Sequence, residues 1–348
     1  MNGMESKETL EDILTAGRKR VEVTEGELDT AKERRDDVGA ALKKAFPGSR
    51  VYVNGSVAHG DALTPLTDVD LGVVVPDPDG EYGPGKKGPT SLMEKAARVL
   101  REELRPKYGD LRVEHEGRKR SILIKFNEPV SERAEDFTAD VIVAIDNPDD
   151  VGLFIPRYTG WDRADPEAHT RMVKKAITDT KVSYAHVVRL LKQWNRAHGK
   201  SLCSWNIKAL ALACITGQTT QLQGLLTWFN HAIAELEKGE TKDPAGVAPK
   251  PIKVNEDMTL KQVVQVLKDA REVLKEANGL GQDGYDVLAA DALARFFNDA
   301  VMLPRQDQGA VRRETAERFT KRQGVGVPAV GVGAGAGRER VNAASWAP

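Results

Sequence analysis

The chain has 348 residues, of which 40% are hydrophobic and 30% are charged. These fractions are typical of a globular protein long enough for two domains, and 51 basic against 52 acidic residues leave a formal charge of −1. A near-neutral balance argues against strong general nucleic-acid binding, and no apolar run reaches about 18 residues, so no membrane association is expected. The charged N-terminus does not resemble a signal peptide, and Cys203 and Cys214 are too few for a disulfide framework or a zinc site. We therefore expect a cytoplasmic protein.

Helical signals open the chain. Residues from about 8 to 46 are expected to be helical, with a break near Gly26, where Thr24-Glu25-Gly26-Glu27 fits a capping box. Pro47-Gly48 ends this segment. A strand at 50–53 and a glycine-containing loop, Gly55-Ser56, are expected to follow.

Two aspartates one residue apart, Asp68 and Asp70, open the next strand. The run from Val69 to Val75 is rich in β-branched residues, which predicts a buried strand. Side chains alternate between the two faces of a strand, so Asp68 and Asp70 share a face, with their Cα atoms about 7 Å apart. Two such carboxylates repel one another unless a cation lies between them. The pair therefore predicts a site for a divalent metal ion.

The rest of the first half mixes one helix with further strands. Residues 76–89 are rich in Pro, Gly and Asp and predict a long surface loop, after which a second capping box, Ser91 to Glu94, is expected to open a helix. Strands are expected near 111–114 and 121–126 and at Asp140–Ile145, the last followed by a turn. Helices mixed with about five strands predict an α+β or α/β sheet domain.

Beyond Asp165-Pro166, a good helix start, strand signals almost vanish. Apolar residues recur with helical spacing around 187–194 and 222–233, and further helices are expected at about 259–277 and 284–299, after a proline-rich connector at 238–254. The composition shift predicts a catalytic domain at 1–160 that includes the N-terminal helices, and a helical substrate-binding domain at 161–323. The Gly-, Val- and Ala-rich segment 324–348 is expected to be disordered.

The motifs together resemble those of a known superfamily. Gly55-Ser56, Asp68-x-Asp70 and Asp140 resemble the polymerase-β-like nucleotidyltransferases. The helix segment Leu190–Arg196, followed by Leu202-Cys203-Ser204-Trp205, looks like the spine helix and next helix start of the bacterial cGAS/DncV-like nucleotidyltransferases, and is similar to cGAS and the oligoadenylate synthetases. This resemblance covers roughly residues 20–300. It implies an α+β fold with a mixed sheet, flanking helices and a C-terminal helical domain, and an active site in the cleft between the two domains.

The resemblance also implies roles for individual residues. Asp68, Asp70 and Asp140 would coordinate two Mg²⁺ or Mn²⁺ ions, with Asp136 as the alternative third carboxylate. Gly55 and Ser56 would form the phosphate loop, and Lys192 and Ser204 would hold the triphosphate tail. Trp205 falls where relatives place an aromatic residue that stacks on a nucleobase.

Each role has a structural alternative. Lys192 fits a solvated helix position, Ser204 a helix N-cap, and Trp205 a core residue. Arg118-Lys119-Arg120 is expected to be a solvated hairpin tip rather than a contact for nucleic acid or a second nucleotide. One departure from the family concerns Gly60-Asp61, because relatives often have Gly-Thr there.

The function expected from this resemblance is a metal-dependent nucleotidyltransferase. It would join nucleoside triphosphates (ATP, GTP, CTP or UTP) into a cyclic or linear oligonucleotide second messenger and release pyrophosphate, in antiphage signalling. Transfer of a single nucleotide to an RNA end, a protein or a small molecule is the alternative, and an inactive nucleotide-binding sensor is the second alternative. A regulatory protein partner is compatible with either enzyme. Base preference, linkage, product size and oligomeric state are not encoded in any motif that we identify.

Overall fold

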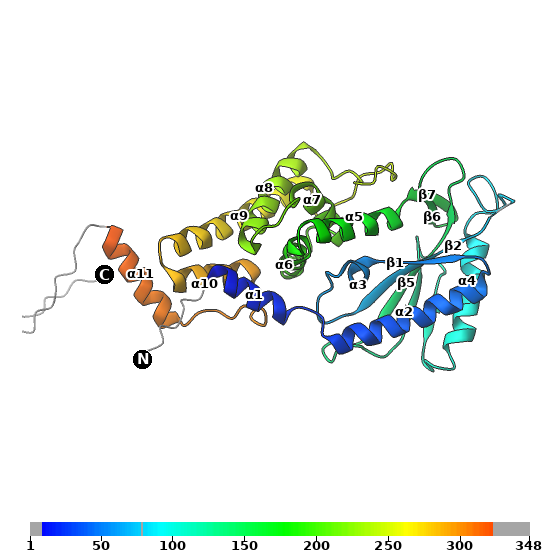
Figure 1. Cartoon of the computed structure of the whole chain (residues 1–348), viewed down its shortest axis with the longest axis horizontal. Helices are drawn as coiled ribbons and strands as arrows, with labels where there is room; N and C mark the ends of the chain where they lie inside the picture. Colours follow the sequence, from blue (N-terminus) through cyan, green and yellow to red (C-terminus); the bar gives the residue numbers. More distant parts are fainter. Residues whose placement is uncertain (1–8, 78, 323–348) are drawn as a thin grey trace, which may run out of the picture.

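The computed structural model describes residues 9–77 and 79–322. A half built on a β-sheet and a half built of helices lie side by side along the long axis of the molecule (Figure 1). The segment 324–348, expected to be disordered, lies outside the described residues. Within the described ranges, no helix is both long enough and apolar enough to cross a membrane.

The sheet has seven strands of mixed direction, as the α+β prediction requires. Its order is β1-β2-β5-β4-β3, and β6 pairs with both β5 and β7. Only β2 and β5 pair in parallel among these strands; the other pairs are antiparallel. The strand bounds are β1 Arg50–Asn54, β2 Asp68–Val75, β3 Arg112–Glu114, β4 Ile122–Lys125, β5 Thr138–Asp146, β6 Leu153–Arg157 and β7 Gly160–Ala164.

One face of the sheet is covered by two helices, α2 (Glu25–Ala45) and α4 (Thr90–Leu104) (Figure 1). Val69, Leu71 and Val73 of β2 point into this covered face and are almost completely buried there with apolar residues of both helices. Because neighbouring side chains alternate, Asp68 and Asp70 lie on the opposite face, as predicted.

Two capping predictions have different outcomes. The box at Thr24 and Glu27 is confirmed: the Thr24 hydroxyl accepts a hydrogen bond from the Glu27 amide, and the Glu27 carboxylate accepts one from the Thr24 amide. The box at Ser91 and Glu94 is wrong. Helix α4 begins at Thr90 with Pro89 as its N-cap, so Ser91 already lies inside the first turn, where it cannot cap.

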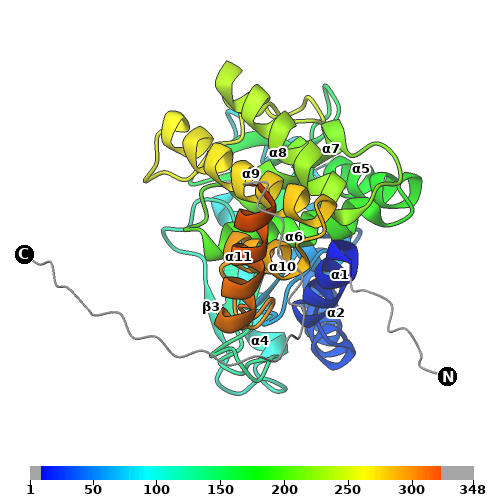
Figure 2. The same cartoon turned by 90° about the vertical axis from the view of Figure 1, so that its left-hand side faces the viewer.

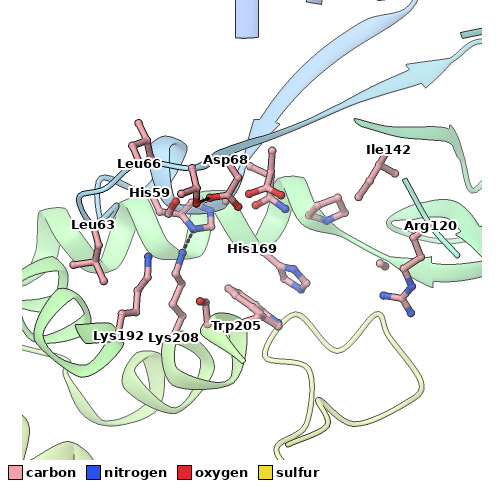
Figure 3. A pocket seen from close by; sticks show the side chains of 18 of the residues that line it. His59, Leu63, Leu66, Asp68, Arg120, Ile142, His169, Lys192, Trp205 and Lys208 are labelled. Atoms are coloured by element: carbon pink, nitrogen blue, oxygen red, sulfur yellow. Dashed lines mark hydrogen bonds between the residues drawn. The ribbon is translucent and has the colours of Figure 1, made fainter. Parts of the chain in front are cut away.

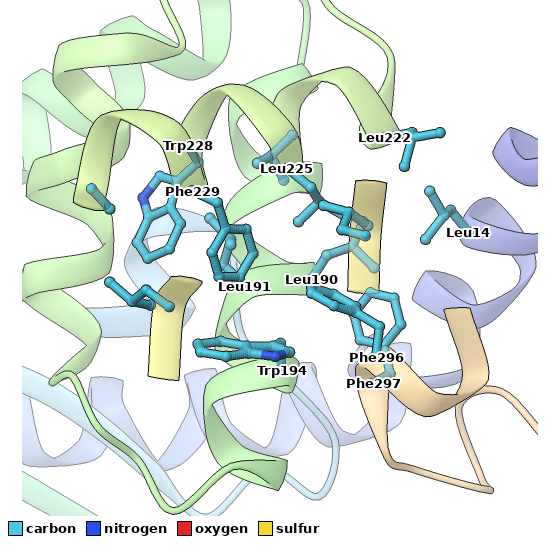
Figure 4. Packing of buried hydrophobic residues seen from close by; sticks show 14 of the residues in the cluster. Leu14, Leu190, Leu191, Trp194, Leu222, Leu225, Trp228, Phe229, Phe296 and Phe297 are labelled. Carbon is cyan, nitrogen blue, oxygen red and sulfur yellow. The ribbon is translucent and has the colours of Figure 1, made fainter. Parts of the chain in front are cut away.

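The helical half surrounds an aromatic core. Trp194 of α6 is 1% exposed and packs edge-on against Phe229 of α8, with ring centroids 5.0 Å apart, and it also stacks with Phe296 of α10, which contacts Phe229 in turn (Figure 4). The helices are α5 Pro166–Asp179, α6 Ser183–Ala197, α7 Ser204–Cys214, α8 Gln221–Lys238, α9 Leu260–Gln282, α10 Asp286–Phe297 and α11 Gln308–Arg322.

The first helix of the chain belongs to this helical core. Helix α1 (Leu10–Arg20) contacts α6, α8 and α10 (Figure 2), and its Leu14 is fully buried in the apolar core of this half (Figure 4). From α1 in the helical half the chain therefore crosses to the sheet at α2 and returns to the helical half at α5.

Two elements were not expected from the sequence. The β6–β7 hairpin extends the sheet, and β7 continues to Ala164, past residue 160 where the helical domain was expected to follow. Residues 55–59 form a short helix, α3 (Gly55–His59), so the expected Gly55-Ser56 loop is its first turn. Pro156 and the charged residues of β7 conceal the strand pattern, because proline removes a backbone donor and the hairpin is only partly buried.

Trp194→Ala should destabilise the protein by about 3–5 kcal/mol, because it deletes a buried indole and leaves a cavity between α8 and α10. Urea denaturation followed by circular dichroism measures the loss. Phe319→Ala is the control, since Phe319 is 62% exposed and its removal should change stability by less than about 0.5 kcal/mol. Equal losses in the two variants would contradict the described core.

Candidate active site

A cavity of about 500 Å³ opens between the sheet and the helical half. Its walls come from β1, α3 and β2 on one side and from α5, α6 and α7 on the other (Figure 3). Seven of the eight residues that the sequence assigned to the site line this cavity: Gly55, Ser56, Asp68, Asp70, Lys192, Ser204 and Trp205.

The eighth residue, Asp140, lies beside the cavity. It is the in-register partner of Asp70 in the parallel β2–β5 pair, so both carboxylates emerge on the same face of the sheet. One oxygen, Oδ1 of Asp140, accepts hydrogen bonds from Ser121 Oγ at 2.7 Å and from the Arg118 guanidinium at 3.1 Å. The prediction of a solvated tip is therefore wrong for Arg118, because its charge is directed inward. The rival carboxylate, Asp136, precedes β5 and binds the amide of Phe137.

Asp68 and Asp70 carry negative charge that the surrounding protein does not balance. Among the described residues neither forms an ion pair, and Asp70 accepts no hydrogen bond. Burial, together with the charges of Asp68 and Asp140, raises the pKa of Asp70 to about 7. Burial likewise raises the pKa of Asp68, against the opposing effect of Lys192. Desolvated, unpaired carboxylates are the environment that a hard divalent cation stabilises.

The site offers two carboxylates to a metal ion and does not surround the ion with protein ligands. In the part of the chain that the structure describes, no three His, Cys, Asp or Glu side chains are gathered closely enough to hold an ion. Ser121 and Arg118 hold Asp140 by one oxygen, Oδ1. Asp68 and Asp70 are thus the residues available to hold a cation, with Asp140 next to them in register.

Glycine is required at position 55 by this carboxylate pair. Gly55 has φ +74°, and a Cβ there would lie 1.8 Å from Oδ2 of Asp70. The backbone of α3 therefore packs directly on the Asp70 carboxylate, and any side chain would displace it. The sequence predicted close backbone approach at Gly55, but toward phosphate rather than toward Asp70.

Three predicted residues reach the cavity from the helical half. The Lys192 side chain is only 10% exposed and its Nζ donates to Asp61, so its interpretation as a solvated residue is wrong. The N-cap of α7 is Cys203, whose Sγ accepts from the Asn206 amide, so the interpretation of Ser204 as an N-cap is also wrong. Ser204 instead lies exposed on the cavity wall, in the first turn of α7.

Trp205 is both a packing residue and a wall of the cavity. Its ring stacks on His169 of α5, with centroids 4.2 Å apart and planes inclined by 30°. The His169 Nε2 lies 2.7 Å from Oδ1 of Asp243, which fixes the imidazole under the indole. The two alternatives for Trp205, core residue and cavity residue, therefore both hold in part.

Sequence reasoning missed a second lysine and its surroundings. Lys208 of α7 lines the cavity and contacts both Asp61 and His59 (Figure 3). The signal that indicated this group was the departure at Gly60-Asp61, where an acid replaces the threonine found in relatives. A single acidic position does not reveal which cations it meets, because these come from distant helices.

A family model matches the part of the chain that forms most of the sheet. Residues 36–146 match the nucleotidyltransferase domain family. The chain carries a nucleotidyltransferase domain. That domain contains Gly55, Ser56 and all three aspartates, whereas Lys192, Ser204 and Trp205 lie outside it. No curated protein matches the sequence significantly.

Solved structures share the fold of the nucleotidyltransferase domain and of the helical half together. CdnC of E. coli MS115-1, solved with ATP, has a TM-score of 0.60 at 16% identity over 83% of this chain and 97% of its own. Vibrio cholerae DncV has a TM-score of 0.65 in its apo form, at 15% identity over 84% of this chain and 96% of its own. DncV with the linear intermediate 5′ pppA(3′,5′)pG has a TM-score of 0.64 at 13% identity, over 83% and 95% of the two chains. At such identities the likeness establishes the fold.

Gly55→Ala should abolish nucleotidyl transfer, with a loss of at least about 100-fold, because the new methyl group displaces the Asp70 carboxylate. Release of pyrophosphate from nucleoside triphosphates measures the loss. Gly60→Ala is a matched control: Gly60 also has positive φ, at +68°, but a Cβ there meets nothing within 4 Å. Similar losses in both variants would mean that backbone strain, rather than the contact with Asp70, is responsible.

Asp70→Asn should stabilise the metal-free protein at pH 8 by about 1–3 kcal/mol, and by much less at pH 5. The folded protein retains the Asp70 proton up to a pKa of about 7. The unfolded chain releases it at the ordinary aspartate pKa of about 3.9. The contribution of Asp70 to the free energy of unfolding therefore falls as pH rises from about 4 to 7. Asparagine does not ionise and escapes this loss.

Urea denaturation in EDTA at both pH values tests this expectation for Asp70→Asn. A difference between the variant and the wild-type protein that is independent of pH would contradict it.

Proposed function

We propose that the protein is a metal-dependent nucleotidyltransferase that joins nucleoside triphosphates into an oligonucleotide and releases pyrophosphate. One observation carries the proposal: uncompensated Asp68 and Asp70 face Lys192 and Lys208 across a single cavity. A nucleoside triphosphate with a divalent cation has charges complementary to those of both walls. The positive cation would bind the carboxylates, and the negative phosphates would bind the lysines.

The chemistry assigned to each residue follows from its place. Asp68 and Asp70, with Asp140 beside them, would hold Mg²⁺ or Mn²⁺, which when bound lowers the pKa of an attacking hydroxyl and neutralises phosphate charge. Gly55 and Ser56 border the same cavity wall and would contact the phosphates. The acceptor hydroxyl would attack the α-phosphorus and release its proton to water; a new P–O ester bond would form, the bond between the α-phosphorus and the bridging oxygen would break, and pyrophosphate would leave toward the lysines.

The base would stack on Trp205. The indole lies on the cavity wall and is backed by His169, which Asp243 holds by its ring nitrogen. Stacking on such a platform contributes about 1–3 kcal/mol per base and tolerates any base. Discrimination among ATP, GTP, CTP and UTP therefore depends on other groups around the base.

A cyclic product and a role in antiphage signalling are the finer parts of the proposal. The cyclic product is supported by the fold shared with DncV, solved as a cyclic AMP-GMP synthase and with a linear dinucleotide intermediate. The antiphage role is what the resemblance of the sequence motifs to this family implies. The complex of CdnC with a HORMA protein supports a regulatory protein partner for this chain as well. Transfer of one nucleotide to an RNA, a protein or a small molecule is the alternative, using the same site.

The purified protein, incubated with labelled ATP, GTP, CTP and UTP and with Mg²⁺ or Mn²⁺, should form a phosphatase-resistant product that mass spectrometry identifies as a cyclic oligonucleotide. Label transferred to added RNA or protein would identify the alternative instead. Nucleotide binding without turnover would identify a sensor.

Asp140→Ala should reduce this turnover by at least about 100-fold, because the in-register neighbour of Asp70 is lost. Asp136→Ala is the matched control and should retain activity, since its carboxylate binds the adjacent Phe137 amide outside the strand. A large loss of activity in Asp136→Ala and a small one in Asp140→Ala would show that Asp136 is the third carboxylate.

A further inference from the structure

Asp61 is a fully buried carboxylate at the junction of the two halves. It follows α3 in the sequence, is 0% exposed, and meets two lysines from different helices of the other half, Lys192 of α6 and Lys208 of α7. The lysine side chains are themselves only 10% and 4% exposed. Two buried ammonium groups with one carboxylate leave an excess of one positive charge.

The contacts with Asp61 and His59 leave each ammonium group at least one donor for a ligand. Lys192 Nζ donates to the backbone oxygen and to Oδ1 of Asp61, both at 2.8 Å. Lys208 Nζ forms an ion pair with Oδ2 of Asp61 at 2.9 Å and donates to His59 Nδ1 at 2.8 Å. An ammonium group has three N–H donors, so at least one on each lysine has no hydrogen-bond partner within the described ranges. Both lysines line the cavity (Figure 3).

The position of Lys208 is fixed further by a chain of hydrogen bonds. His59 accepts from Lys208 at Nδ1, so its Nε2 carries the proton and donates to Thr170 Oγ1 at 3.0 Å. Thr170 donates in turn to Oδ1 of Asn54 at 3.2 Å. Burial and the neighbouring Lys208 lower the pKa of His59 to about 3, so the imidazole is neutral and accepts this bond. This series of hydrogen bonds connects α7, α3, α5 and β1.

The two ammonium groups line the same cavity as Asp68 and Asp70. Burial alone would raise the pKa of Asp61, but Lys208 and Lys192 outweigh burial and lower it to about 2, so Asp61 remains ionised. The excess positive charge of the two lysines therefore borders the space where the polyphosphate would lie.

We propose that Asp61 is a positioning residue that holds Lys192 and Lys208 side by side as a two-ammonium clamp for the polyphosphate tail of a nucleoside triphosphate. This inference rests on the proposed function and extends it to two residues, Asp61 and Lys208, that the sequence motifs do not assign. The clamp recognises a chain of phosphates and makes no contact with the base. It therefore separates triphosphates from monophosphates and is indifferent to the nucleobase.

The first test replaces one arm of the clamp. Lys208→Gln leaves Asp61 paired with Lys192, a balanced buried pair, so the variant is expected to fold. Calorimetry in Mg²⁺ buffer with an ATP analogue carrying an α,β-methylene bridge, with AMP and with inorganic tripolyphosphate measures binding without turnover. Affinity for the analogue and for tripolyphosphate should fall about tenfold or more, with AMP unchanged. Lys175→Gln, on the exposed face of α5, is the matched control and should change none of the three.

A double-mutant cycle tests whether Asp61 acts through the lysines. Asp61→Asn should raise KM for ATP about tenfold or more and leave kcat within about threefold. Asp61→Asn combined with Lys208→Gln should lose little more than either single variant, because both changes dismantle the same clamp. Additive losses would contradict the positioning role. If Asp61→Asn fails to fold, Lys208→Gln alone decides the proposal.

Two outcomes separate the failure of this inference from that of the proposed function. Unchanged binding of the analogue and of tripolyphosphate by folded Lys208→Gln, while the wild-type protein binds and turns over ATP, would overturn the clamp alone. Failure of the wild-type protein to bind either polyphosphate would overturn both proposals.

Discussion

Parallel pairing of β2 with β5 is the contact on which the rest of the site depends. Its register sets Asp70 beside Asp140, and strand alternation sets Asp68 on the same face. The opposite face of these strands is packed against α2 and α4, so a slip of one residue would bury the carboxylates in an apolar layer. The hydrophobic core of the sheet therefore specifies where the acidic groups emerge.

The helical half supplies the opposite charge. Lys192 and Lys208 lie on the adjacent helices α6 and α7 and line the cavity (Figure 3). Asp61, which follows α3 in the sequence, meets both lysines. A buried, balanced ion pair contributes little net stability, and a third charge in the same place is costly. The protein retains that third charge next to two unpaired carboxylates, at a cost in stability. A bound polyphosphate and cation would neutralise these charges.

The success of prediction from sequence differs between elements for physical reasons. The strand that carries Asp68 and Asp70 was predictable because it is rich in β-branched residues, and the Thr24 helix start because its two capping residues lie only three positions apart. The β6–β7 hairpin was not, since Pro156 and charged residues interrupt its pattern. The Ser91 helix start was misplaced because a capping motif does not exclude a neighbouring residue as the cap.

The sequence by itself determined that Asp68 and Asp70 share one face of a strand, because side chains alternate along a strand and this is a local property. The other groups of the site, Gly55, Lys192 and Trp205, were implied by the resemblance of the motifs to a known family. Tertiary structure alone decided that Gly55 makes room for Asp70, that Arg118 binds Asp140, and that Asp61 meets Lys192 and Lys208. Each of these contacts joins residues far apart along the chain. Their partners follow from packing that no local pattern encodes.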